Sequence, residues 1–150
     1  MDVAYRDLMR AKQNLRVDEL SAQNRDRLTL FQGSLLYRDG RLSGFDAAAL
    51  VEVIEHIEPE RLPALEQVVF AAAAPKTVVV TTPNAEYNAL YGMDTGLMRH
   101  NDHRFEWSRA ELAAWANRVA EQNQYTVTIT GVGEPDETVG ASSQMAVFQK

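Results

Sequence analysis

The sequence contains no cysteine, which excludes disulfide bonds and thiolate metal sites. Any metal would therefore be held by carboxylates, imidazoles or water. The longest apolar runs fall far short of the roughly 18 residues that a membrane span needs. The first residues, MDVAYRDLMR, carry too many charges for a signal peptide. We therefore expect a soluble, cytoplasmic protein that does not associate with membranes.

The sequence also has fewer basic than acidic residues, 15 against 21. The net charge of −6 argues against a large nucleic-acid footprint, because phosphate contacts usually come with a basic face. The segment from Arg99 to Arg109 runs against this balance, since it combines arginines and histidines with Phe105 and Trp107. Such a patch suits a protein that grips only the end of an RNA strand. An ordinary solvated loop explains the same residues equally well.

The 150 residues, 45% hydrophobic and 24% charged, are enough for one globular domain with a real core. Helical spacing of apolar residues predicts helices, and alternating or β-branched runs predict strands. Pro59 is expected at the first position of one helix, and Ser108 with Glu111 forms a capping box before another. The expected order is helix 5–15, strand 27–32, strand 45–51, helix 60–74, strand 77–82, a helix from 108 through 119, strand 125–132 and strand 145–149.

This alternating order predicts an α/β fold, and the run FDAAALV at 45–51 predicts a strand buried on both faces of a parallel sheet. Active sites of open α/β sheets lie beyond the carboxyl ends of the strands. The residues directly after Val51 and after Thr82 are therefore where we expect chemistry.

Two glutamates and a histidine, Glu52, Glu55 and His56, follow the buried strand. If a helix begins at Glu52, this spacing puts all three side chains on one face. Clustered carboxylate and imidazole groups favour manganese, magnesium, iron or zinc over softer metals. A fourth ligand would come from His100 or His103. The same short run also occurs on ordinary helix surfaces, so a solvated face is the alternative.

Other known motifs give no evidence for a different function. The chain has no His-Glu-x-x-His metalloprotease signature. Gly131-Val132-Gly133 lacks the spacing of a dinucleotide-binding loop, and we interpret it as a strand end.

Three motifs together resemble one family. They are Glu52-Val53-Ile54-Glu55-His56-Ile57, then Thr81-Thr82-Pro83-Asn84-x-Glu86-Tyr87-Asn88, then Arg99-His100-x-Asp102-His103-Arg104-Phe105-Glu106-Trp107-Ser108-Arg109. In this order they are similar to the small-RNA 3′-terminal 2′-O-methyltransferases of the HUA-enhancer type, in the bacterial RNA-repair version. The similarity runs from Asp2 to about Gly133.

The resemblance implies the S-adenosylmethionine-dependent methyltransferase (Rossmann-like) fold, a mainly parallel sheet with an antiparallel strand near the C-terminus. It also implies a divalent metal, Mn²⁺ or Mg²⁺, bound by Glu52, Glu55, His56 and His103. Glu55 and His56 would act in catalysis. The metal would hold the 2′ and 3′ hydroxyls of the terminal ribose of RNA, and an octahedral ion with four protein ligands has two positions left for them.

The resemblance assigns Asp2 to the cofactor's ribose and Ser34 to its adenine side. The family's Gly-rich loop is not found in this sequence. We therefore expect residues 1–150 to be a partial methyltransferase domain, truncated at its N-terminus, with its first strands and cofactor loop missing.

The first hypothesis is metal-dependent methyl transfer from S-adenosylmethionine to the 2′-hydroxyl of the 3′-terminal ribose of RNA, weak or inactive in this chain alone. The second is a non-catalytic, metal-dependent module that binds RNA 3′ ends. A metal-dependent hydrolase is the third, and the missing signatures disfavour it. An RNA end-repair kinase-phosphatase/ligase is the expected protein partner.

Overall fold

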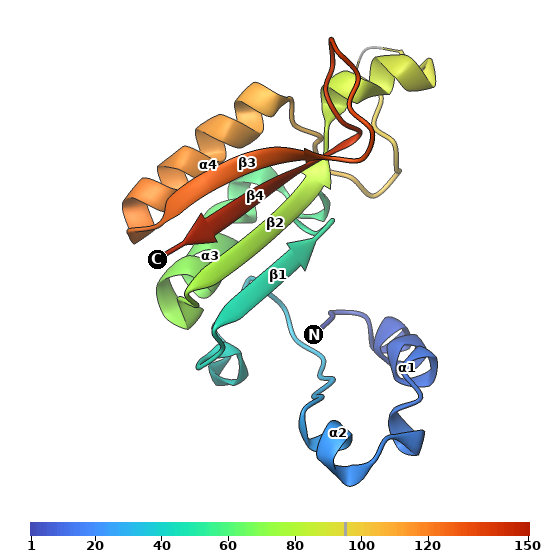
Figure 1. Cartoon of the computed structure of the whole chain (residues 1–150), viewed down its shortest axis with the longest axis vertical. Helices are drawn as coiled ribbons and strands as arrows, with labels where there is room; N and C mark the ends of the chain where they lie inside the picture. The colour runs from blue at the N-terminus through green and yellow to red at the C-terminus, as the bar shows by residue number, and fades with distance from the viewer. Residues whose placement is uncertain (95) are drawn as a thin grey trace.

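The structure is a computed structural model that describes residues 1–94 and 96–150. A four-stranded sheet and two larger helical segments form its main body, with short helices at the N-terminal end (Figure 1). The π-helix Gln67–Ala73 continues α3, and short 3₁₀ helices fill several connections. The main elements are α1 (Tyr5–Asn14), α2 (Ala22–Asp26), β1 (Ala47–Val51), α3 (Leu62–Glu66), β2 (Thr77–Pro83), α4 (Arg109–Asn123), β3 (Thr126–Val132) and β4 (Ser143–Gln149).

The strands lie in the order β1-β2-β4-β3. β1 and β2 are parallel, whereas β4 runs antiparallel to both β2 and β3. Three strands therefore point one way, and the reversed strand is the last in the chain. The predicted α/β fold with an antiparallel strand near the C-terminus is confirmed.

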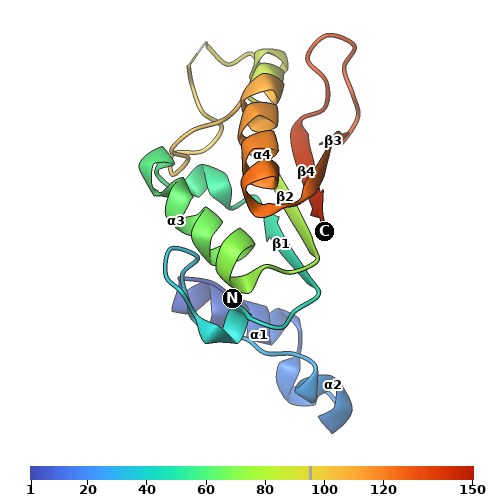
Figure 2. The same ribbon diagram turned by 90° about the vertical axis from the view of Figure 1, so that its left-hand side faces the viewer.

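One face of the sheet carries the apolar core. Alternate strand residues such as Leu50, Val80 and Phe148 are buried, as the two-residue period of a half-covered sheet requires. α3, its π-helical continuation and α4 pack against this face (Figure 2). Phe70 and Trp115 from these helices complete the core cluster.

The helix boundaries largely follow the sequence signals. Pro59 begins a 3₁₀ turn that leads into α3, and the helical segment ends before the left-handed Ala74. Ser108 and Glu111 form the predicted capping box at α4. No helix in the described ranges is long and apolar enough to cross a membrane.

Two strand predictions were wrong in part. β1 is an edge strand, with Ala47, Ala49 and Val51 exposed, so it is not buried on both faces. Residues 27–32 do not form a strand; only Gln32 pairs, in a single parallel bridge with Asp2. The physical reasons differ. The exposed side chains of β1 alternate with buried Leu50, so they lie on the face of the sheet that α3 and α4 do not cover. Residues 27–32 have no neighbouring strand in the described ranges with which to form a ladder.

Candidate metal and cofactor site

The chain turns sharply at the carboxyl end of β1. Glu52 has a φ of 51°, in the left-handed region that residues other than glycine rarely adopt. Its backbone N–H donates to the Thr81 carbonyl at 3.2 Å, which ties the turn to the end of β2. The 3₁₀ helix Ile54–His56 follows. The single helical face expected for Glu52, Glu55 and His56 is therefore absent from these residues, because the helix begins only after Glu52.

The turn buries Glu55 completely. Its carboxylate Oε2 accepts a hydrogen bond from Thr82 Oγ1 at 3.0 Å. Burial raises the pKa of the Glu55 carboxyl above its ordinary value, and the nearby charge of Glu52 adds to the shift. The other oxygen, Oε1, is buried and receives no hydrogen bond from the residues that the structure describes.

His103 reaches the same place from a segment distant in sequence. The backbone N–H of Arg104 donates to the Glu55 carbonyl at 2.7 Å. A parallel bridge between Asn84 and Trp107 fastens the other end of this segment to the end of β2. The rings of His56 and His103 then lie edge to face, with centroids 4.9 Å apart.

Ligand atoms of Glu55, His56 and His103 all lie within 4.8 Å of one another. This donor set fits a divalent cation. A buried carboxylate oxygen without a partner is costly, and a cation beside two neutral imidazoles would remove that cost. The three sequence-predicted residues are therefore brought together, and the exposed His100 is not part of the group.

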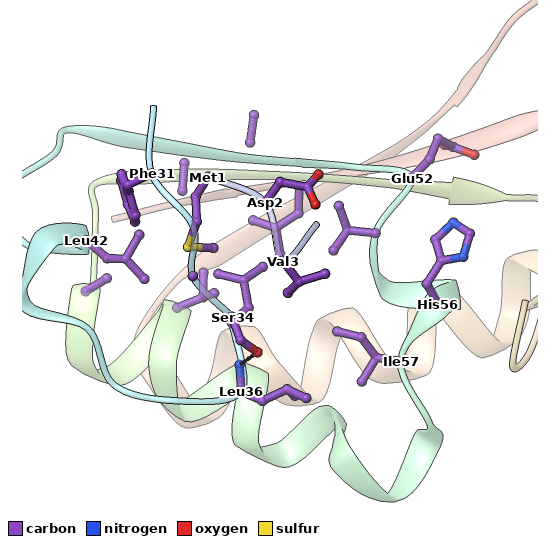
Figure 3. Close-up of a pocket in the computed structure, with 18 of the residues that line it drawn as sticks. Met1, Asp2, Val3, Phe31, Ser34, Leu36, Leu42, Glu52, His56 and Ile57 are labelled. Atoms are coloured by element: carbon purple, nitrogen blue, oxygen red, sulfur yellow. Dashed lines mark hydrogen bonds between the residues drawn. The ribbon is translucent and has the colours of Figure 1, made fainter. Parts of the chain in front are cut away.

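Glu52 stands apart from this group. Its carboxylate Oε1 accepts a hydrogen bond from Thr81 Oγ1 at 2.8 Å. Figure 3 shows it beside His56 at one end of a groove, in the chain that follows β1. Its role as a ligand stays a prediction, and it requires the side chain to turn from Thr81 toward the cluster.

The groove has a volume of about 930 Å³ and lies between the N-terminal segment and the edge of β1. Asp2 and Ser34 line it together with Glu52 and His56 (Figure 3). Ser34 Oγ also accepts the backbone N–H of Leu36 at 3.2 Å. The predicted cofactor residues and part of the predicted metal set thus share one cavity of a size that holds small molecules. Their cofactor roles stay predictions.

Two carboxylates that the sequence analysis did not single out contact the histidines. Glu106 Oε1 lies 2.6 Å from His103 Nδ1, and Asp102 Oδ2 lies 3.2 Å from His56 Nδ1. Burial alone would raise the pKa of Glu106, but hydrogen bonds from Asn88, the Arg99 backbone and His103 outweigh it and lower that pKa. Both acids stand within the third sequence motif, and their spacing from His103 was the signal available.

The basic segment is largely engaged within the protein. Arg99 donates to the carbonyls of Asn84 and Ser142, and Arg109 pairs with Glu86 at 2.6 Å. A broad phosphate-binding patch is therefore a poor description of residues 99–109.

The sheet and its flanking helices define the class of protein. A SAM-dependent methyltransferase from Archaeoglobus fulgidus superposes with a TM-score of 0.59 at 13% identity, covering 83% of this chain and 69% of that one. The chain has the fold of S-adenosylmethionine-dependent methyltransferases.

Closer relatives identify the family. The methyltransferase domain of bacterial CtHen1 superposes with a TM-score of 0.87 at 47% identity, covering 99% of this chain and 75% of that one. A small RNA 2′-O-methyltransferase of Xenopus tropicalis is 48% identical over 126 residues, which are 82% of this chain and 34% of that protein. The chain belongs to the small RNA 2′-O-methyltransferase family.

The chain spans about a third of the length of the curated animal relatives that it matches. The corresponding protein of Arabidopsis thaliana is 32% identical over 165 residues, covering all of this chain and 18% of that protein. No family model matches the chain.

Proposed function

We propose that this chain supplies the metal- and RNA-end-binding part of an enzyme that methylates the 2′-hydroxyl of the 3′-terminal ribose of RNA. S-adenosylmethionine is the methyl donor. The observation that carries the proposal is the buried Glu55 with its unpartnered oxygen beside His56 and His103. The similarity to small RNA 2′-O-methyltransferases of Xenopus tropicalis and Rattus norvegicus supports 2′-O-methylation of small RNA as the reaction.

Glu55, His56 and His103 would hold the divalent cation, with Glu52 as the fourth ligand after its side chain turns. When bound, such a cation polarises hydroxyl groups and makes them easier to deprotonate. We assign Mn²⁺ or Mg²⁺, the ions that the family resemblance implies; carboxylate and imidazole ligands without sulfur are compatible with both.

The residues that line the groove would have different roles in the reaction. Asp2 and Ser34 would bind the adenosine part of the cofactor, and His56 would face the terminal ribose. The 2′-oxygen would bond to the methyl carbon as the carbon–sulfur bond of the sulfonium breaks, the electron pair of that bond would stay on sulfur, and the hydroxyl proton would pass to solvent. Of the two residues predicted as catalytic, His56 lines the groove and would contact substrate, whereas Glu55 is buried and would hold the cation.

The metal test is calorimetry with manganese. We expect one ion per chain, and we expect His103→Ala to weaken binding by at least about tenfold, the scale of losses from metal-supporting residues. His100→Ala is the matched control, because His100 is exposed and outside the cluster. Full-strength binding by His103→Ala would remove that residue from the site.

The substrate test compares RNA ends. If both ribose hydroxyls are held, RNA ending in a 2′,3′-diol should bind in manganese, and RNA with a 3′-deoxy, 2′-deoxy or 3′-phosphate end should bind far less. Equal binding of diol and 3′-deoxy RNA, with and without chelator, would sink the chelation mechanism.

The alternative function is a non-catalytic, metal-dependent module that binds RNA 3′ ends. Cofactor binding separates the two. Because the sequence contains no Gly-rich loop of the expected kind, we expect weak S-adenosylmethionine binding by this chain. Micromolar or tighter binding would contradict that expectation. A repair kinase-phosphatase/ligase partner and a cytoplasmic location stay predictions.

A further inference from the structure

Each histidine of the cluster has a carboxylate at its Nδ1 atom, and the two pairs differ in burial. The Glu106 side chain is 2% exposed and lies 2.6 Å from His103. Asp102 is 58% exposed and contacts both His56 and His100. Of these two pairs, Glu106–His103 is the one enclosed in the protein, and Asp102 is shared between two histidines.

The hydrogen bonds around Glu106 show which partner donates. Its Oε1 accepts the backbone N–H of Arg99 at 2.6 Å, and its Oε2 accepts Asn88 Nδ2 at 2.6 Å. These two groups can only donate. A carboxylate surrounded in this way has acceptor sites to offer His103, so the contact at 2.6 Å is best made by a protonated Nδ1.

The Arg99 side chain connects Asn88, the partner of Glu106, to the ends of two strands. Its Nε atom donates to Asn88 Oδ1 at 2.5 Å, while Nη1 donates to the Ser142 carbonyl at 2.8 Å. Nη2 donates to the Asn84 carbonyl at 2.5 Å. Asn84 follows β2 and Ser142 precedes β4, so Glu106 is anchored to the rigid end of the sheet.

We propose that Glu106 is a positioning residue that holds His103 in the tautomer with its proton on Nδ1. A neutral imidazole in this tautomer has its lone pair on Nε2, the only nitrogen left to bind a cation. In metal sites, such partners orient the ring and raise its basicity as a ligand. The metal part of this inference rests on the proposed function; the tautomer does not.

The experiment observes the histidine nitrogens directly. Long-range proton–nitrogen NMR spectra of ¹⁵N-labelled, metal-free protein near neutral pH should show His103 with its proton on Nδ1. In Glu106→Ala, His103 should lose that preference, and manganese affinity should fall by about tenfold or more. Glu106→Gln keeps an oxygen acceptor, so it should retain much of the Nδ1–H form.

Glu86→Gln is the matched control, because this carboxylate is bonded to Arg109 instead. It should change neither the tautomer nor the affinity. A wild-type His103 with its proton on Nε2 overturns the inference at once. So does a folded Glu106→Ala protein whose tautomer and manganese affinity are both unchanged.

If Glu106→Ala does not fold, the wild-type tautomer decides: a proton on Nδ1 supports the inference, and a proton on Nε2 overturns it. Manganese titration of the wild-type protein separates the two proposals. Absence of binding there would contradict the metal site, while an Nδ1–H tautomer that depends on Glu106 would still support the positioning role.

Discussion

The part of the chain from residue 45 onward contains the apolar core, whereas residues 1–44, all described by the structure, bury only Leu8. Leu35 and Leu36 pack against the core from the N-terminal part. Single contacts hold the rest, such as the Asp2–Gln32 bridge and the bond from Gln32 to the Val3 carbonyl.

The predicted metal ligands and the predicted cofactor residues lie in different parts of this division of the chain. All the predicted metal ligands lie in the part that contains the core, and both predicted cofactor residues, Asp2 and Ser34, lie in the part with little burial. The metal cluster therefore lies in the part with the packed core, while the segments that carry Asp2 and Ser34 bury little apolar surface. Local stability follows buried apolar contacts, so variants can test this contrast.

The largest effect is expected at Phe70, which is 1% exposed and lies 4.8 Å from Phe148 between ring centroids. Phe70→Ala should lower the free energy of unfolding by about 4 kcal/mol, because it removes a large side chain from a packed core. Urea unfolding followed by circular dichroism measures this. A loss below about 1 kcal/mol would show that the core is not what holds residues 45–150 together.

The next effect concerns Glu66, which accepts hydrogen bonds from Trp115 Nε1 and Arg118. Glu66→Ala should cost about 2 kcal/mol, the lower range for a buried pair because Arg118 is half-exposed. Glu121→Ala is the control, because Glu121 is exposed on α4, the helix that carries Trp115 and Arg118.

This loss should depend on pH. Burial raises the pKa of Glu66, but the bonds from Arg118 and Trp115 outweigh it and bring that pKa below its ordinary value of 4.5. A lowered folded-state pKa gives stability that is present above the unfolded value and lost as the pH falls through the folded one. The difference between wild type and Glu66→Ala should therefore shrink below about pH 4.5. A constant difference down to the acid transition would contradict this account.

A smaller effect isolates the backbone at Glu52. Glu52→Gly and Glu52→Ala both remove the carboxylate, but only glycine adopts a φ of 51° without strain. The glycine variant should be more stable than the alanine variant by about 1 kcal/mol. Thermal melts of the two proteins measure this, and equal stability would mean that the turn relaxes. Both variants should bind manganese more weakly if Glu52 is a ligand.

The smallest effect on the core is expected from Leu8→Ala in α1. Distant sites act almost independently, so core amides should change by less than about 0.5 kcal/mol. Hydrogen exchange should instead show faster opening of residues 5–14. Equal loss of protection in both parts would show that they unfold as one unit.

The sequence predicted those features that a local pattern or the family resemblance indicates. The capping box at Ser108, the β-branched β2 and the reversal of the last strand all followed from pattern or resemblance. Glu55, His56 and His103 were predicted as ligands, and the structure brings them together.

Other features depend on contacts between distant segments. The exposure of Ala47, Ala49 and Val51 depends on which face of the sheet the helices cover, and residues 47–51 alone do not determine that. The left-handed turn at Glu52 is set by its bond to Thr81, across the sheet. Glu106 carries a local signal, three residues after His103, but its burial by Asn88 and Arg99 appears only in three dimensions.

The outer edge of β1 also affects how the protein behaves in bulk solution. In the described ranges no strand covers this edge, and Ala47, Ala49 and Val51 are exposed on the uncovered face of the same strand. Free backbone groups flanked by small apolar side chains form a template on which another molecule can add a strand. Protein concentration thus becomes an experimental variable: light scattering should rise with it, and Ala49→Lys should raise the usable concentration because a charged edge discourages such growth.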